Sequence, residues 1–257
     1  MIRFSANLGF LWNTLPLPDA IHAAKRAGFE AVECHWPYAT PSNEVKKALN
    51  ETGLKMLGLN TQRGNVASGD NGVAAIVGRE QEARAFIDEA IAYANEIDCL
   101  NIHVMAGFTD HGEQAENCFR ENLAYACEQA AKSDKVILIE PLNKYDAPGY
   151  HLSTLETALE TQRAVAKPNL KIMFDCYHLQ IMGDDLIRRL GSCMKNVGHI
   201  QIAAVPDRGE PDKGEINYPW LLKEIDNLGW AGFIGAEYKP RTSVEDGLTW
   251  LSAYHLK

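Results

Sequence analysis

The 257-residue sequence has no run of about 18 apolar residues, the length that a membrane-spanning helix needs. Its N-terminus reaches polar residues before any apolar stretch long enough for a signal peptide. The cysteines form no Cys-x-x-Cys pair, and a chain of this length does not need disulfides for stability. We therefore expect reduced thiols and a cytoplasmic protein with no membrane contact.

Clusters of lysine and arginine are also missing. Acidic residues number 34 and basic residues 25, so the formal charge is −9. A chain with this charge repels phosphate backbones and anionic lipid surfaces. We expect no nucleic-acid partner.

Short apolar or β-branched runs occur eight times, with amphipathic, helix-like segments between them. The runs cover residues 2–7, 30–35, 55–60, 99–104, 136–140, 171–175, 198–202 and 233–237. Repeats of roughly 32 residues are typical of a (β/α)8 barrel. No linker rich in proline or serine divides the chain, so we predict an α/β protein, a (β/α)8 TIM barrel, as a single domain over residues 1–257. The alternative is a doubly wound open sheet, but no Gly-x-Gly-x-x-Gly motif follows the first run.

The residues at or next to the C-terminal ends of these runs are unusually polar, and a parallel barrel brings the carboxyl ends of its strands to one mouth. They are Asn7, His35, Asn60, His103, Glu140, Asp175, Gln201 and Glu237, and His178 follows Asp175 by three positions. A single carboxylate at a strand end more often caps a helix or pairs with a cation. Three of them in one cleft repel one another unless a cation or bound protons neutralise them.

We therefore predict a divalent metal held by Glu140, Asp175, Glu237 and the amide oxygen of Gln201. Oxygen ligands suit Mg²⁺ or Mn²⁺, and a set without His or Cys disfavours Zn²⁺. His178 is a candidate metal ligand, second-shell group or substrate hydrogen-bond donor, and the alternative is a core histidine. His103 and Asn60 are candidate substrate-binding residues at the same mouth.

Several longer motifs resemble the hydroxypyruvate isomerase family, one of the xylose-isomerase-like TIM barrels. They are Arg3-Phe-Ser-Ala-Asn-Leu8, Gly78-Arg-Glu80, Ile139-Glu-Pro-Leu-Asn143, Pro148-Gly-Tyr-His-Leu152, Asp175-Cys-Tyr-His178, His199-Ile-Gln-Ile-Ala203, the run from Pro206 to Trp220, and Gly235-Ala-Glu-Tyr-Lys-Pro240. The resemblance spans almost the whole chain. It implies interconversion of hydroxypyruvate and tartronate semialdehyde, with Glu140 and Glu237 as the paired acid/base carboxylates, and it implies a homo-oligomer. Relatives that isomerise four-carbon 2-oxo-tetronates share the pattern, so both substrate lengths remain open.

Moving a carbonyl between neighbouring carbons requires a proton to leave one carbon and return to the other. We expect the metal to bind the carbonyl and hydroxyl oxygens of a small anionic hydroxy-keto acid and to stabilise the enediolate, while Glu140 and Glu237 move the proton. A metal-assisted hydride shift would use the same residues. Arg208, Lys239 and Arg79 are the cations that we expect near the substrate's carboxylate.

Three other functions are compatible with a barrel of this kind. A metal-dependent sugar 3-epimerase would use the same metal and the same two acids, and only product analysis separates it from an isomerase. A non-catalytic sugar-acid binding protein would not need two acids beside one metal. A nuclease would need several metals, more histidine ligands and a basic surface, which the charge disfavours.

Overall fold

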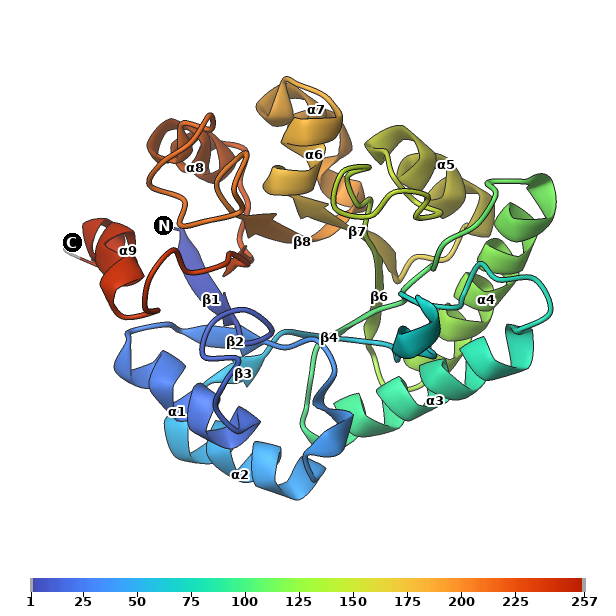
Figure 1. The fold of residues 1–257 in the computed structure, drawn as a ribbon, viewed down its shortest axis with the longest axis horizontal. Coiled ribbons are helices and arrows are strands. Elements are labelled where there is room, and N and C mark those ends of the chain that lie inside the picture. Colours follow the sequence, from blue (N-terminus) through green and yellow to red (C-terminus); the bar gives the residue numbers. More distant parts are fainter. Residues whose placement is uncertain (1, 256–257) are drawn as a thin grey trace.

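Nine parallel strands form a barrel in the computed structural model, which describes residues 2–255 (Figure 1). They are β1 (Arg3–Asn7), β2 (Ala31–Glu33), β3 (Lys55–Met56), β4 (Gly58–Asn60), β5 (Asn101–His103), β6 (Val136–Ile139), β7 (Leu170–Asp175), β8 (Val197–Ile202) and β9 (Phe233–Ala236). Their order around the sheet is β3-β2-β1-β9-β8-β7-β6-β5-β4. Each described pair of neighbouring strands is parallel, as the alternation of strands and helices predicts.

The barrel closes through the stretch that we predicted as a single strand over 55–60. This stretch is divided at Leu57 into β3 and β4, which form the two ends of the sheet order. The Leu57 N–H donates to the carbonyl of Val32 at 2.8 Å, and the Cys34 N–H donates to the carbonyl of Gly58 at 3.0 Å. These bonds join both parts of the stretch to β2 or to the residue after it. The predicted strand over 55–60 therefore counts as two strands, and the barrel architecture is unchanged. The predicted (β/α)8 TIM barrel is confirmed.

Helices surround the barrel on its outer side in Figure 1. They are α1 (Leu17–Arg26), α2 (Ser42–Thr52), α3 (Glu80–Glu96), α4 (Glu113–Ala131), α5 (Leu155–Val165), α6 (Cys176–Met182), α7 (Leu186–Cys193), α8 (Tyr218–Asn227) and α9 (Thr249–His255). Short 3₁₀ turns are η1 (Pro37–Ala39), η2 (Val66–Ser68), η3 (Met194–Asn196) and η4 (Asp246–Leu248).

The helix α3 shows how the spacing of apolar residues decides which face of a helix is buried. Ala83, Ile87, Ala90 and Ala94 recur at spacings of three and four residues, and all are buried. Phe86, next to Ile87 in the sequence, is only half-buried. Helical periodicity therefore identifies the buried face of α3, and Phe86 lies at the border of that face.

Alternation along the strands divides apolar from polar side chains. In β8, Ile200 and Ile202 belong to the hydrophobic core, whereas His199 and Gln201 line a cavity inside the barrel. Successive side chains of a strand point to opposite faces, so the same strand supplies both the core and the cavity. The functional site is thus built on the most buried part of the fold.

Two sequence expectations concern the chain as a whole. Within residues 2–255, no helix combines the length and apolar character needed to cross a membrane. All six cysteines are buried and unbridged, as expected for reduced thiols.

Candidate active site

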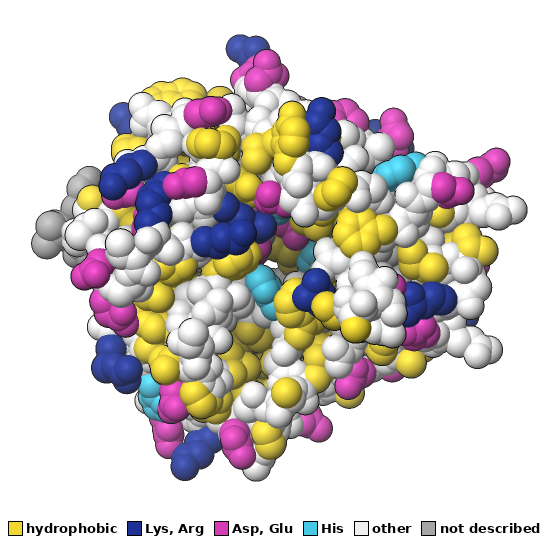
Figure 2. Space-filling model, in the orientation of Figure 1, with side chains coloured by type: hydrophobic (Ala, Val, Ile, Leu, Met, Phe, Trp, Pro, Cys, Tyr) yellow, Lys and Arg dark blue, Asp and Glu magenta, His cyan; other side chains and the backbone are white. Residues whose placement is uncertain are grey.

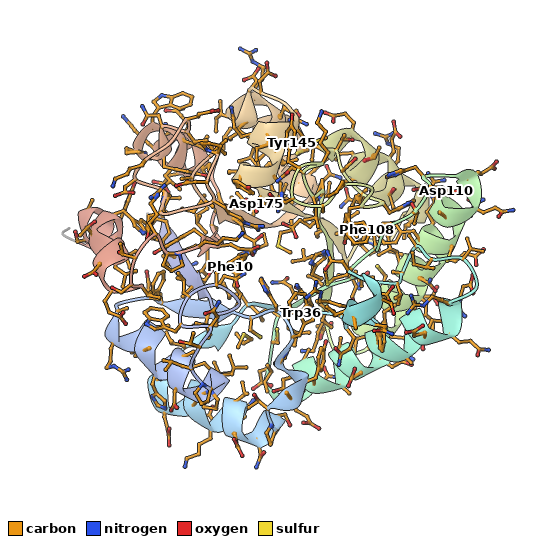
Figure 3. The ribbon with its side chains drawn as sticks, in the orientation of Figure 1. Phe10, Trp36, Phe108, Asp110, Tyr145 and Asp175 are labelled. Carbon is orange, nitrogen blue, oxygen red and sulfur yellow. The ribbon has the colours of Figure 1, made fainter. Side chains whose placement is uncertain are left out.

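The carboxyl ends of the strands surround one opening. The face in Figure 2 is hollowed near its centre, and Lys or Arg side chains and a His side chain border the hollow. Phe10, Trp36 and Asp175 lie around the barrel centre in Figure 3, whereas Asp110 lies near the rim of the molecule. The sequence places polar strand ends at this mouth because each strand runs in the same direction.

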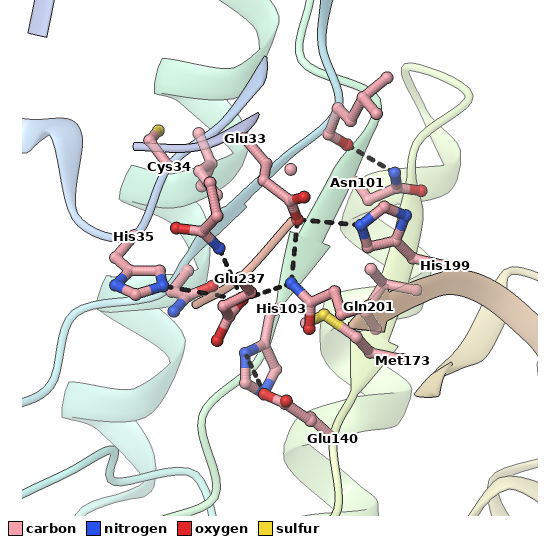
Figure 4. A pocket seen from close by; sticks show the side chains of 16 residues that line it. Glu33, Cys34, His35, Asn101, His103, Glu140, Met173, His199, Gln201 and Glu237 are labelled. Atoms are coloured by element: carbon pink, nitrogen blue, oxygen red, sulfur yellow. Dashed lines mark hydrogen bonds and ion pairs between the residues drawn. The ribbon is translucent and has the colours of Figure 1, made fainter. Parts of the chain in front are cut away.

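A cavity with about 370 Å³ of empty space, including its open part, lies inside the barrel. Six of its polar lining residues are Glu33, His35, His103, Glu140, Gln201 and Glu237 (Figure 4). They come from five different strands or the one or two residues that follow them, since Glu33 and His35 both belong to the end of β2. The fold therefore brings together side chains that lie up to 204 positions apart in the sequence, from Glu33 to Glu237.

Glu237 is held on both carboxylate oxygens. Its Oε2 accepts from the side-chain amides of Asn7 and Gln201, each at 2.5 Å. Its Oε1 accepts from the guanidinium of Arg208 at 2.7 Å. His35 lies 3.9 Å away through its Nε2. Four side chains thus fix the orientation of this carboxylate.

Arg208 connects Glu237 to the other acids. Its guanidinium lies 3.6 Å from Asp175 Oδ2, and the side chain is only 12% exposed. The rings of Phe10 and Tyr177 lie 4.8 and 4.9 Å from the guanidinium carbon. Contact with two aromatic rings orients the planar cation and still leaves N–H groups free for a ligand. Of the three cations predicted for the substrate's carboxylate, Arg208 is in direct contact with the acidic group.

The other two predicted cations lie elsewhere. The guanidinium of Arg79 donates to Asp70 and Glu82 at 2.7 to 2.8 Å, so two neighbouring carboxylates already bind it. The Lys239 side chain is exposed and lies in a surface groove beside Phe10, outside the barrel cavity. Neither is brought to the acids in the described part of the chain.

Glu33 belongs to the site and was missed by the sequence reasoning. It ends β2, and its oxygens accept from Ser5, His199 and Gln201 at 2.9 to 3.0 Å. Gln201 therefore donates both to Glu33 and to Glu237, which leaves its amide oxygen free to face the cavity. A carboxylate inside an otherwise apolar strand, two positions before His35 and so on the same face, was the signal available in the sequence.

His178 lies between two acids. Its Nε2 is 3.9 Å from Glu140 and 3.7 Å from Asp175, and the ligating atoms of these three residues all lie within 4.8 Å of one another. The backbone N–H of Asn143 donates to its Nδ1 at 3.0 Å, so the neutral ring carries its proton on Nε2. Burial, followed by the charge of Arg208, lowers the pKa of His178 to about 3, so the ring is neutral near pH 7. A neutral ring with Nε2–H turned toward the acids fits a hydrogen-bond donor better than a metal ligand.

His103 and Asn60 end neighbouring strands and line the same cavity. Both ring nitrogens of His103 are buried without a hydrogen-bond partner, and Nδ1 lies 3.8 Å from Glu140. Burial lowers the pKa of His103 to about 4. The cavity therefore contains unpaired polar atoms of the kind that a polar ligand would satisfy.

The electrostatics of the site are dominated by an excess of acid. Burial, together with the charges of Glu237 and Asp175, raises the pKa of Glu140 well above its ordinary value. Burial raises the pKa of Asp175 to about 7 against the opposing charge of Arg208. Burial also acts to raise the pKa of Glu237, but His35 and Arg208 outweigh it and lower that pKa to about 2. Without a further cation, Glu140 and Asp175 therefore retain protons at pH values where isolated carboxylates would lose them.

These residues fit a hard divalent cation. Glu140 Oε1, Asp175 Oδ2 and Gln201 Oε1 are buried oxygens without any hydrogen-bond partner. Unpaired buried acceptors are costly, and oxygen donors of this kind bind Mg²⁺ or Mn²⁺. The predicted metal set is therefore chemically suited to such an ion, with Glu237 as the member whose oxygens already have partners.

A closed parallel barrel with acids at the carboxyl ends of its strands defines the class of TIM-barrel enzymes. The profile of the family described as "Xylose isomerase-like TIM barrel" matches residues 21–254, and the chain belongs to that family. The resemblance inferred from the motifs is thereby confirmed.

Curated relatives align over nearly the whole chain. A 2-oxo-tetronate isomerase of Cupriavidus necator is 42% identical over 257 residues, covering 99% of each chain. A hydroxypyruvate isomerase of Escherichia coli is 40% identical over 257 residues, covering 99% of this chain and 100% of that protein. A solved structure from Brucella melitensis, described as an AP endonuclease of family 2, is 39% identical, with a TM-score of 0.96 over 99% of both chains. The two curated relatives are both isomerases and carry two different substrate names.

Proposed function

We propose that this protein isomerises a small hydroxy-keto acid, interconverting hydroxypyruvate and tartronate semialdehyde. The observation that carries the proposal is the set of three unpaired buried oxygens, on Glu140, Asp175 and Gln201, beside the carboxylate of Glu237. A four-carbon 2-oxo-tetronate is the alternative substrate, because relatives of both names align over almost the whole chain.

Glu140, Asp175, Gln201 and Glu237 would hold the divalent cation, Mg²⁺ or Mn²⁺. When bound, the cation polarises the carbonyl and hydroxyl oxygens of the substrate and so makes the neighbouring C–H more acidic. Such a cation would also relieve the repulsion among the carboxylates, two of which, Glu237 and Asp175, are already in contact with Arg208.

Glu140 and Glu237 move the proton. One carboxylate removes a proton from C3 of hydroxypyruvate, and C2 receives a proton from the other as the C2 oxygen becomes a hydroxyl and the C3 hydroxyl becomes the aldehyde. In the reverse direction the two glutamates exchange roles. Glu237 is held by Asn7, Gln201 and Arg208, whereas Oε1 of Glu140 has no hydrogen-bond partner among the described residues. Glu140 therefore has the greater freedom to follow the substrate carbon.

Arg208 binds the carboxylate that both substrates carry. The planar guanidinium has five N–H donors, its Nε has no partner, and its contacts with the rings of Phe10 and Tyr177 fix its orientation beside the acids. His178 donates from Nε2 to a substrate oxygen, and His103 and Asn60 supply further polar contacts along the wall. These neutral donors orient the substrate without adding to the negative charge.

The test is a product assay on both substrates side by side. Purified protein loaded with Mn²⁺ is given hydroxypyruvate in one reaction and 2-oxo-tetronates in another, and products are identified by NMR. We expect the carbonyl to move from C2 to C3 in at least one substrate, which gives an aldehyde from hydroxypyruvate or a 3-oxo acid from a 2-oxo-tetronate, and we expect no product after chelation. An inverted stereocentre with no movement of the carbonyl would instead identify an epimerase.

A further inference from the structure

Arg208 lies on the loop that joins β8 to α8, residues 203–217, in an uncommon backbone conformation. Its φ is 55°, in the left-handed region that few residues other than glycine adopt. Its N–H donates to the carbonyl of Ala204 at 2.8 Å, and its carbonyl accepts from the N–H of Lys239 at 2.7 Å. A conformation of this kind persists where surrounding contacts fix it. The contacts that fix the loop therefore decide where the guanidinium lies.

Arg241, on the loop after β9, contacts residues on both sides of Arg208. Its Nε and one terminal nitrogen donate to the two carboxylate oxygens of Asp207 at 2.7 and 3.0 Å. Its other terminal nitrogen donates to the carboxylate of Glu210 at 2.9 Å, and its backbone N–H donates to the same carboxylate at 3.0 Å. One side chain thus holds the residue before Arg208 and a residue two positions after it.

The packing around Arg241 depends on this arrangement. A Cβ on Gly209 would lie 2.5 to 2.6 Å from atoms of the guanidinium, so only glycine leaves room for it. A Cβ on Gly247 would overlap the Glu210 carboxylate. The Glu210 side chain is 4% exposed, and that of Arg241 is 27% exposed. The Glu210 carboxylate is buried and accepts from both the guanidinium and the backbone N–H of Arg241, which separates this pair from ordinary surface ion pairs that contribute little.

We propose that Arg241 is a positioning residue for substrate binding: by holding Asp207 and Glu210, it fixes the loop backbone from which Arg208 reaches Glu237. The proposal rests on the proposed function, in which Arg208 binds the carboxylate of the substrate. Without Arg241, two carboxylates lose their common partner, and the left-handed backbone at Arg208 loses its support. The guanidinium then leaves the position between Phe10 and Tyr177 for part of the time.

The experiment combines a double-mutant cycle with hydrogen exchange. Steady-state kinetics are measured for wild type, Arg241→Gln, Arg241→Lys, Arg208→Met and the double variant Arg208→Met/Arg241→Gln, all loaded with Mn²⁺. Backbone amide exchange over residues 204–215 is followed by mass spectrometry in the same proteins. Arg189→Gln is the matched control, because Arg189 also binds a carboxylate, that of Glu156, from a half-buried position outside the site.

We expect Arg241→Gln to lower kcat/KM by about tenfold to a hundredfold, mainly through KM, since small displacements of a binding group have effects of this size. Arg241→Lys keeps the charge without the bidentate contact and should show a smaller loss. In the Arg208→Met background, Arg241→Gln should change kcat/KM by less than about twofold, because independent effects would instead add. Exchange over 204–215 should be faster in Arg241→Gln and unchanged in Arg189→Gln.

Wild-type kcat/KM in Arg241→Gln, or an equal loss in both backgrounds, would overturn the proposal. If Arg208→Met itself keeps wild-type kcat/KM, the carboxylate contact in the proposed function is wrong. Hydrogen exchange then tests whether Arg241 fixes the loop backbone. Faster exchange over 204–215 in Arg241→Gln supports that role, and unchanged exchange overturns it. Should Arg241→Gln not fold, Arg241→Lys is read by the same criteria.

Discussion

Two groups of carboxylate and histidine side chains, one around the half-buried Glu116 and one at the buried barrel mouth, have opposite hydrogen-bond states. On α4, Glu116 accepts from Arg120 at 2.6 Å and from Thr161 at 2.8 Å, and it pairs with Nε2 of His151 at 3.0 Å. His151 completes the group through its Nδ1, which lies 2.8 Å from the Thr109 hydroxyl. Each carboxylate oxygen and each ring nitrogen of this pair has a partner.

At the barrel mouth, the same chemical groups lack partners. Glu140 Oε1, Asp175 Oδ2, His178 Nε2 and both ring nitrogens of His103 are buried without a hydrogen bond. Hydrogen bonds, first that of His151, lower the pKa of Glu116 to about 2, whereas burial raises the pKa of Glu140. A satisfied group stabilises the fold, and an unsatisfied one retains capacity for a ligand. The comparison therefore assigns stability to the first group and chemistry to the second.

Exchanging glutamate for glutamine in each group gives the largest expected contrast. Glu140→Gln and Glu237→Gln should each lower kcat by several orders of magnitude, of which acid–base help alone accounts for about 10²–10⁴. Glu116→Gln, the matched control, should keep wild-type kcat and lower the free energy of unfolding. Glu140→Gln should not lower that free energy, since it replaces a buried carboxyl group whose Oε1 has no hydrogen-bond partner. Steady-state kinetics and urea unfolding decide, and near-normal turnover in Glu140→Gln would remove it from the pair.

Metal removal should affect the mouth group alone. Chelated protein should lose most turnover and regain it with Mn²⁺ or Mg²⁺, and free Mn²⁺ at about 100 times its Kd should stabilise the fold by about 2.7 kcal/mol. Asp175→Asn keeps the acceptor for the Tyr177 N–H but replaces the unpaired oxygen, so it should lose this stabilisation. Glu116→Gln should retain it. Melting curves with and without Mn²⁺ measure the effect, and full activity in rigorously metal-free protein would contradict the metal-centred site.

The contribution of Glu116 to the free energy of unfolding should depend on pH. Because the folded pKa of Glu116, about 2, lies below its ordinary value of 4.5, its stabilisation is complete above about pH 4.5 and is lost as the pH falls toward 2. The free-energy difference between wild type and Glu116→Gln should be at most about 3 kcal/mol near neutral pH and should shrink across that window. Urea unfolding at several pH values measures it. A difference that stays constant with pH would show that the charge of Glu116 does not stabilise the fold.

The smallest expected effect is a difference in KM between variants of two cations, Arg208 and Lys239. Arg208→Met should raise KM, with a loss of about 1.5–3 kcal/mol, the usual contribution of a charged hydrogen bond. Lys239→Met should leave KM unchanged, because the Lys239 side chain is exposed in a surface groove, whereas Arg208 contacts Asp175 and Glu237. Both variants are compared in the same steady-state assay. Equal KM values for Arg208→Met and wild type would mean that other groups hold the carboxylate.

The sequence predicts the barrel and much of the mouth because both follow from local patterns. Glu140, Asp175 and Glu237 each follow or end an apolar run, and a parallel barrel places such positions together. Gln201 was found in the same way. Their convergence required no knowledge of side-chain direction, only of where each strand ends.

Other features depend on tertiary contacts that no local pattern contains. Glu33 was passed over because the second run was taken to end at His35, whereas β2 ends at Glu33. Arg79 follows a predicted strand in the sequence and was therefore expected near the mouth, but Asp70 and Glu82 bind its guanidinium. Arg208 and Lys239 are both cations on loops beyond strand ends, and only the folded loop shows which one turns inward. Loop conformation and long-range ion pairs set these outcomes.

The central claim, that two carboxylates at the mouth move a proton between neighbouring carbons, is tested most directly by isomerisation in D₂O. Mn²⁺-loaded protein converts hydroxypyruvate in D₂O until the reaction reaches equilibrium, and the product is analysed by NMR. A proton that resides on a carboxylate exchanges with solvent, whereas a transferred hydride does not. We predict deuterium on the carbon that receives the proton, C2 of tartronate semialdehyde. Isomerised product that carries only protium at that carbon would contradict proton transfer and indicate a hydride shift.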